Sequence, residues 1–182
     1  MRVIAGQAKG IQLQAVPGSG TRPITDRVKE AVFNILRPDI IDAWVLDLFA
    51  GTGGVGIEAL SRGAARAVFV EKHPKAIATI RTNLQRTRLK AKAQIVQADV
   101  FGFLAGEPEP FDFVYIAPPQ YQGLWSKTLI TLEQNPGWLA PAGLVIVQIF
   151  PKEFEPVGLD SLELIDERKY GSTLLCFYEH RE

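Results

Sequence analysis

The stretch Val45–Gly63, VLDLFAGTGGVGIEALSRG, constrains the fold more than any other part of the chain. Val45–Phe49 is a short apolar run with one acid, which is typical of a buried strand. Residues 50–54, AGTGG, are small enough for a tight turn, and a helix then begins at Val55 and ends at Gly63. Such a glycine turn presents free backbone N–H groups and the positive end of a helix dipole to a ligand.

Two features of this stretch indicate which ligand the turn would take. The spacing Gly51-x-Gly53-x-x-Gly56 is shared by many dinucleotide-binding proteins, so a nicotinamide dehydrogenase is one interpretation. Asp47 favours another, because an acid at the end of the first strand repels a pyrophosphate and attracts a cation. The amine and sulfonium of S-adenosylmethionine (SAM) are such cations. A helix cap or a structural hydrogen bond is the alternative role for Asp47.

Strands and helices alternate along the chain after this point. Hydrophobic periodicity predicts strands at Val45–Phe49, Ala67–Val70, Ala93–Gln97, Phe111–Ile116 and Leu144–Ile149, and helices at Val55–Arg62, Pro74–Arg88, Val100–Leu104 and Ser126–Glu133. Leu162–Ile165 and Thr173–Tyr178 predict a closing hairpin. This order predicts an α/β fold with a seven-stranded, mostly parallel sheet that ends in an antiparallel hairpin and has helices on both faces.

The chain ahead of this alternation reads as a small extension. Met1–Val16 alternates loosely around two glycines and predicts a β-hairpin. Asp26–Leu36 predicts a helix with Thr25 as its N-cap. We therefore expect an N-terminal β-hairpin extension over residues 1–20 and one domain over residues 21–182.

Charge is unevenly spread although the net charge is zero. Residues 1–37 hold six Lys or Arg against two Asp or Glu, and Arg81–Lys92 holds five basic residues and no acid. Such segments allow one face to bind nucleic acid, with a solvated helix face as the alternative. Cys176 is the single cysteine, so an internal disulfide and a cysteine-based metal site are excluded. With no signal peptide or membrane-spanning run, we expect a cytoplasmic monomer that needs no metal.

Residues that follow parallel strands gather at one edge of the sheet, where such folds bind ligands. Glu71 and Asp99 follow the second and third strands, where carboxylates can accept from ribose hydroxyls and an adenine amino group. A surface ion pair and a helix cap are their respective alternatives. Pro118-Pro119 follows the fourth strand and leaves its carbonyls without competing local N–H groups, so they can accept from an amine. Tyr121 and Trp125 can stack on a flat base, with ordinary packing as the alternative.

Together these motifs resemble SAM-dependent methyltransferases of the Rossmann-like class I. More narrowly, the chain resembles the RsmD family, which methylates the exocyclic N2 of a guanine in small-subunit ribosomal RNA. The blocks that carry the resemblance are Arg2–Gly6, Lys9-Gly10, Arg22–Leu36, Leu46–Gly53 and Gly56–Gly63.

The resemblance implies the same reaction here, on ribosomal RNA that is either free or in an assembled small-subunit particle. The cofactor-binding residues that it implies are Thr25, Asp47, Phe49, Ala50, Gly51, Gly53, Glu71, Asp99 and Val100. The implied catalytic residues are Ala117, Pro118, Pro119 and Tyr121. The candidate contacts to RNA phosphates are Lys9, Arg22, Arg27 and Lys29, with ion pairs to Asp26 and Glu30 as their alternative.

The loop after the fourth strand departs from the family pattern. The family has Asp directly before the two prolines and an aromatic residue directly after them, whereas this chain has Ala117 and Gln120, with Tyr121 one residue later. In similar enzymes that acid accepts a hydrogen bond from the target amine. The backbone carbonyls of Ala117 and Pro118 are candidates for that role here. A SAM-binding RNA module with little catalysis, and a methyltransferase with a different acceptor, therefore remain alternatives.

Overall fold

A seven-stranded sheet forms the centre of the computed structural model, which describes residues 1–18 and 23–182. The strand order is β3-β2-β1-β4-β5-β7-β6. Strands β1 to β5 pair in parallel, and β7 pairs antiparallel with both β5 and β6. The expected sheet with its antiparallel end is therefore confirmed. The strands are β1 (Trp44–Leu48), β2 (Arg66–Glu71), β3 (Ala93–Gln97), β4 (Phe111–Ile116), β5 (Leu139–Ile149), β6 (Leu162–Tyr170) and β7 (Thr173–His180).

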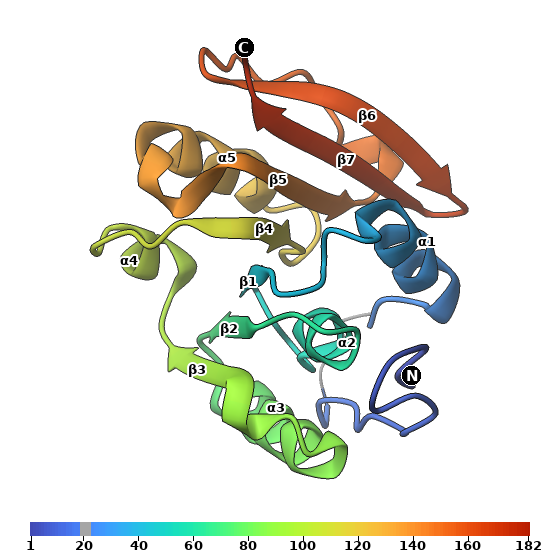
Figure 1. Cartoon of the computed structure of the whole chain (residues 1–182). Coiled ribbons are helices and arrows are strands. Elements are labelled where there is room, and N and C mark those ends of the chain that lie inside the picture. The colour runs from blue at the N-terminus through green and yellow to red at the C-terminus, as the bar shows by residue number, and fades with distance from the viewer. Residues whose placement is uncertain (19–22) are drawn as a thin grey trace.

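Helices cover both faces of this sheet (Figure 1). The apolar cluster on one face includes residues of α1, α2 and α3, and the cluster on the other face includes residues of α4 and α5. The α-helices are α1 (Asp26–Leu36), α2 (Gly54–Ser61), α3 (Pro74–Thr87), α4 (Val100–Leu104) and α5 (Leu124–Gln134). Short 3-10 turns are η1 (Lys90–Lys92), η2 (Pro136–Trp138) and η3 (Pro151–Glu153). The predicted helices are all present: α1 and α4 have the predicted bounds, and only the ends of α2, α3 and α5 differ.

The strands β5 and β6 extend furthest beyond their predicted ranges, because strand pairing lengthens them. β5 begins at Leu139 rather than Leu144, since Leu139 pairs with Phe111 of β4 beyond a register shift. β6 continues to Tyr170, where it pairs with Thr173 across the closing turn. These pairings join residues that are distant along the chain or that lack strand periodicity of their own.

The N-terminal segment folds back on itself without the two strands of the expected β-hairpin. A single antiparallel bridge joins Arg2 and Gln12 in place of two regular strands. The backbone N–H groups of Ile4 and Ala5 donate to the carboxylate of Glu58 on α2. Across the segment, the N–H of Val3 donates to the carbonyl of Ile11 and that of Leu13 to the carbonyl of Met1, at 3.0 and 2.9 Å. The expected hairpin is therefore not shown as two strands, because α2 takes up the backbone between these bonds.

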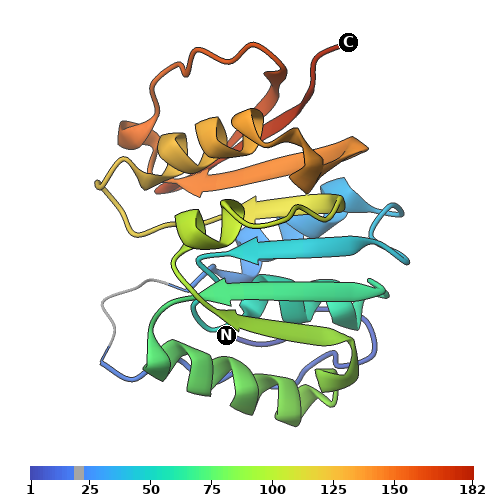
Figure 2. The ribbon, with the colours of Figure 1, turned by 90° about the vertical axis from the view of Figure 1, so that its left-hand side faces the viewer.

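The carboxyl ends of the parallel strands lie at one edge of the sheet, where their arrowheads point to the same side in Figure 2. Along residues 1–18 and 23–182, no helix combines the length and apolar character needed to cross a membrane. In the same described ranges, no group of three or more His, Cys, Asp or Glu side chains is placed to hold a metal ion.

Candidate functional site

The turn between β1 and α2 needs its glycines for two different reasons. Gly51 and Gly53 have φ values of 57° and 77°, in the left-handed region that side chains with a Cβ disfavour. Gly56 has an ordinary φ, but a Cβ there would lie 2.3 Å from the ring of Phe69 on β2. The first two glycines therefore shape the turn, and the third allows α2 to pack closely on the sheet.

Asp47 is a buried acid beside this turn, with 2% of its surface exposed. Its Oδ2 accepts a hydrogen bond of 3.1 Å from the backbone N–H of Gly56, so the structural role considered for it is present. Burial raises the pKa of Asp47 to about 8, the hydrogen bond from Gly56 opposes the rise, and the negative charge of Glu71 adds to it. No ion pair in residues 1–18 and 23–182 includes Asp47. A cation bound beside this carboxylate would stabilise its charged form.

Glu71 connects the end of β2 to the glycine turn. It is 7% exposed, and its Oε2 accepts from the N–H of Gly51 at 2.9 Å. Its Oε1 accepts from the N–H groups of Lys72 and His73 at 2.9 and 3.0 Å. Its hydrogen bonds in this structure thus come from backbone groups rather than from the lysine side chains that a surface ion pair would use.

Asp99 and Thr25 cap the first turns of two helices. Asp99 is exposed, and its Oδ1 accepts from the N–H groups of Phe101 and Gly102 at the start of α4. Thr25 accepts from the N–H of Val28 at 3.2 Å, which confirms it as the N-cap of α1. The neighbouring Val100 is buried in the apolar cluster under α4 and α5, so its side chain is directed away from solvent.

The loop after β4 presents one exposed aromatic ring at the carboxyl edge. Tyr121 is 66% exposed and has a φ of 59°. Its ring stacks on Phe150 with centroids 5.6 Å apart, and its N–H donates to Oε1 of Glu153 at 2.7 Å. These contacts tie the loop to the turn after β5. Ala117, the first residue after β4, packs against the cluster on the α1–α3 face.

Trp125 does not share this exposure. It is 2% exposed in the cluster under α5, and its ring stacks on Phe154 with centroids 6.1 Å apart. The prediction that Trp125 stacks on a base is therefore wrong, because the first turn of α5 directs this ring into the core.

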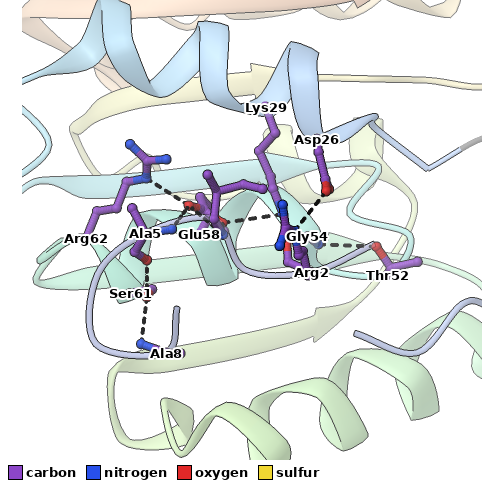
Figure 3. A network of polar contacts seen from close by, with 12 residues as sticks. Arg2, Ala5, Ala8, Asp26, Lys29, Thr52, Gly54, Glu58, Ser61 and Arg62 are labelled. Carbon is purple, nitrogen blue, oxygen red and sulfur yellow. Dashed lines mark hydrogen bonds and ion pairs between the residues drawn. The ribbon is translucent and has the colours of Figure 1, made fainter. Parts of the chain in front are cut away.

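Lys29 lies inside the protein rather than on an RNA-facing surface (Figure 3). Its Nζ is 3.3 Å from Oε2 of Glu58, both side chains are 0% exposed, and Nζ also donates to the carbonyl of Arg2. Arg62 holds the other oxygen of Glu58 at 2.8 Å. Burial lowers the pKa of Lys29, and the charge of Glu58 acts in the opposite direction. The prediction that Lys29 contacts phosphate is wrong, because its helix position belongs to the buried face of α1.

The other predicted RNA-binding residues have different positions. Arg27 is exposed, and its guanidinium lies over the ring of Tyr170, 5.8 Å from the centroid. Lys9 is exposed on the N-terminal segment. Arg22 lies outside the described residues. Arg27 and Lys9 are thus accessible to a polyanion.

Asn83 links the site to the N-terminal segment and was missed by sequence reasoning. It is 0% exposed on α3 and donates from Nδ2 to the carbonyls of Thr52 and Gln14, each at 3.0 Å. Its Oδ1 accepts from the N–H of Gln14 at 2.7 Å. The sequence feature that could have indicated this role is an amide on the apolar face of α3, between Ile80 and Leu84.

The comparisons with known proteins cover almost the whole chain. The family described as "Conserved hypothetical protein 95" matches residues 1–179. The Ribosomal RNA small subunit methyltransferase D of Escherichia coli K12 is 42% identical over 180 residues, which cover 98% of this chain and 89% of the relative. The protein of the same name from Haemophilus influenzae is 32% identical over 184 residues, with 99% and 94% covered.

A solved structure agrees with these relatives. The Escherichia coli protein yhhF superposes with a TM-score of 0.87 at 39% identity, and the match covers 99% of this chain and 97% of that one. The resemblance to the RsmD family is therefore confirmed along the whole length, and this chain belongs to the family described as conserved hypothetical protein 95.

Proposed function

We propose that this protein transfers a methyl group from SAM to the exocyclic N2 of a guanine in small-subunit ribosomal RNA. Two relatives that share 42% and 32% identity over nearly the full chain carry the name ribosomal RNA small subunit methyltransferase D. The observation that carries the choice of methyl donor is Asp47, a buried acid without an ion-pair partner among the described residues, at the end of β1. A cationic ligand suits that position, whereas a pyrophosphate does not.

The residues around the glycine turn match the groups of SAM. Asp47 would face the cationic amine and sulfonium, and Glu71 the ribose. Each carboxylate oxygen has two lone pairs, so Oε2 of Glu71 can accept from a hydroxyl as well as from Gly51. Asp99 is exposed and uses only Oδ1 for its helix-capping bonds, which leaves Oδ2 to accept from the adenine amino group. Phe49, Ala50, Gly53, Thr25 and Val100 complete the proposed cofactor site.

When bound, SAM would supply a methyl group on a sulfonium sulfur. Transfer would form the N–C bond as the C–S bond breaks, and the electron pair of the C–S bond would stay on sulfur. One amine proton would be released to water. The donor is already activated, so the protein contributes mainly by positioning the amine. The target base leaves its stack to reach the site. Tyr121 offers an exposed ring that Phe150 and Glu153 hold in place, and the carbonyls of Ala117 and Pro118 lie at the start of the same loop.

RNA outside the target base would meet basic side chains on α1 and on the extension over residues 1–20, which precedes the methyltransferase domain over residues 21–182. Arg27 and Lys9 are exposed, and Arg27 is close to Tyr170 of β6. Contacts of this kind neutralise phosphates and weaken as salt rises. Arg27→Ala should therefore lower the affinity for RNA and reduce its salt dependence. We place this activity in the cytoplasm and assign it to a monomer.

The experiment measures transfer of labelled methyl groups from SAM to ribosomal RNA, both free and in small-subunit particles from cells that lack this gene. We expect label at a guanine N2. Tyr121→Ala should slow transfer about tenfold or more, because stacking on one aromatic ring is worth roughly 1–3 kcal/mol. Trp44→Ala is the matched control, since Trp44 is a part-exposed aromatic at the opposite end of the sheet.

The outcomes separate the proposed enzyme from its alternatives. SAM binding in calorimetry without label in any RNA would refute the proposed activity and favour a SAM-binding RNA module. Label in another acceptor would support a methyltransferase activity but refute the proposed substrate. A Tyr121→Ala variant as active as the wild type would remove the stacking role alone.

A further inference from the structure

An amine accepts a methyl group through its nitrogen lone pair, so the enzyme must orient that lone pair. Hydrogen-bond acceptors that hold the amine N–H groups achieve this. At the end of β4, Ala117 has no side-chain acceptor. The carboxyl ends of the neighbouring strands are therefore the places to search for one.

The pairing of β4 with β5 places Gln148 beside Ala117. Ile116 pairs with Val147, so the next position along each strand brings Ala117 next to Gln148. Side chains alternate between the two faces of a sheet. Tyr115, two residues before Ala117, lies in the cluster on the α1–α3 face, and Ala117 packs against that same cluster. By the same alternation, Gln148 is on this face as well.

A hydrogen bond from Tyr115 orients the amide of Gln148. The hydroxyl of Tyr115 donates to Oε1 of Gln148. Tyr115 is 2% exposed, and burial, followed by the charge of Asp47, raises its pKa, so the hydroxyl stays protonated as a donor. Gln148 itself is half-buried and reaches the carboxyl edge. An amide oxygen has two lone pairs, so Oε1 retains one after accepting from Tyr115.

We propose that Gln148 is a catalytic residue of this protein, whose amide oxygen accepts a hydrogen bond from the target amine beside Ala117. This assignment rests on the proposed methyl transfer. Gln148 orients the amine and does not remove its proton, because an amide is not a base near neutral pH, and the proton leaves to water. Tyr115 is a positioning residue, since it acts through Gln148.

The test compares single-turnover methyl transfer to small-subunit particles at saturating SAM. Gln148→Leu should slow transfer about tenfold or more, the loss expected when one hydrogen bond in the transition state is removed. Its affinity for SAM, measured by calorimetry, should stay within about twofold of wild type because the proposed role of Gln148 is to hold the amine and not the cofactor. Gln85→Leu is the matched control, since Gln85 is exposed on α3, and its rate should equal that of the wild type.

Two further variants identify the missing acceptor as the cause. Adding Ala117→Asp to Gln148→Leu supplies an oxygen from the adjacent strand, and we expect it to restore the rate to within about threefold of wild type. Gln148→Glu keeps an oxygen in place and should remain active within about threefold. If Gln148→Leu fails to fold, the Gln148→Glu variant tests the role of Gln148 instead. A Gln148→Glu protein that folds and binds SAM but transfers no methyl group would overturn the assignment.

The result also distinguishes this assignment from the function on which it rests. If the wild-type chain transfers no methyl group, the proposed function fails and the role of Gln148 fails with it. If the wild type is active and Gln148→Leu matches its rate, only the role of Gln148 is overturned.

Discussion

Replacing Asp47 by Asn should make the ligand-free protein more stable at neutral pH and weaken its binding of SAM. The pKa of Asp47 is about 8 in the folded protein, against an ordinary value of 3.8. At pH 7 the folded protein therefore keeps a proton on Asp47 that the unfolded chain has lost. The stability associated with this group is fully present below pH 3.8 and is lost progressively as the pH rises to about 8.

The size of the effect follows from that difference in pKa. Each pKa unit corresponds to about 1.4 kcal/mol, so the roughly three units between the ordinary value and pH 7 cost about 4 kcal/mol of folding free energy. Asn is nearly the same size, and its amide oxygen can still accept from the N–H of Gly56 without taking up a proton. We expect Asp47→Asn to gain about 2–4 kcal/mol at pH 7, which raises Tm by about 5–15 °C. Near pH 4 the gain should be below about 1 kcal/mol.

Thermal unfolding between pH 4 and pH 8.5 measures this directly. Asp112→Asn is the matched control, because Oδ2 of Asp112 also accepts one backbone N–H, from Trp44 at 2.8 Å, but the side chain is part-exposed at the amino end of β4. The control should show no comparable gain. The reasoning is refuted if the Tm of Asp47→Asn at pH 7 equals or falls below the Tm of the wild type, and if the difference between the two does not change with pH.

The same group predicts a proton signal on ligand binding. A bound cation draws Asp47 into its charged form, so SAM binding at pH 7 should release close to one proton per site. Calorimetry in buffers of different ionisation enthalpy measures this release, which should be absent in Asp47→Asn. That variant should also bind SAM at least about tenfold more weakly, the factor that corresponds to about 1.4 kcal/mol.

Two further substitutions test the packing beneath the site. Lys29→Met removes the buried partner of Glu58 and should destabilise the protein by about 3–5 kcal/mol. Unfolding in denaturant measures this loss, and an unchanged denaturant midpoint would contradict the buried ion pair. Gly56→Ala places a Cβ 2.3 Å from the ring of Phe69 and should cost about 1–3 kcal/mol or more, whereas Gly102→Ala meets nothing within 4 Å and serves as its control. Equal stability of the two alanine variants would show that the helix moves to make room.

Local sequence patterns predicted the elements of this fold well, because each pattern reports a local physical requirement. The apolar stripe of Asp26–Leu36, with a capping hydroxyl at Thr25, predicted α1 with its correct ends. The apolar runs at Ala93–Gln97 and Phe111–Ile116 predicted β3 and β4 in the same way. The alternation of strands and helices then predicted a parallel sheet, and the glycines marked where its ligand-binding edge begins.

Contacts between distant segments decided what these patterns could not. Lys29 counts as a basic residue in the sequence, but a carboxylate 29 positions away, Glu58, holds it inside the protein. The N-terminal segment has the composition of a hairpin, yet Glu58 of α2 accepts the backbone N–H groups of Ile4 and Ala5.

Some features of the candidate site could likewise be predicted from local sequence, and others depend on contacts between distant segments. Sequence patterns alone indicated that Asp47 and a glycine turn lie at the end of one strand and that a proline loop follows a later strand, since those features are local. Only the tertiary structure placed Gln148 beside Ala117 and gave it a hydrogen bond from Tyr115. Strand register and burial decide such pairs, and both depend on how the whole sheet assembles rather than on any one segment.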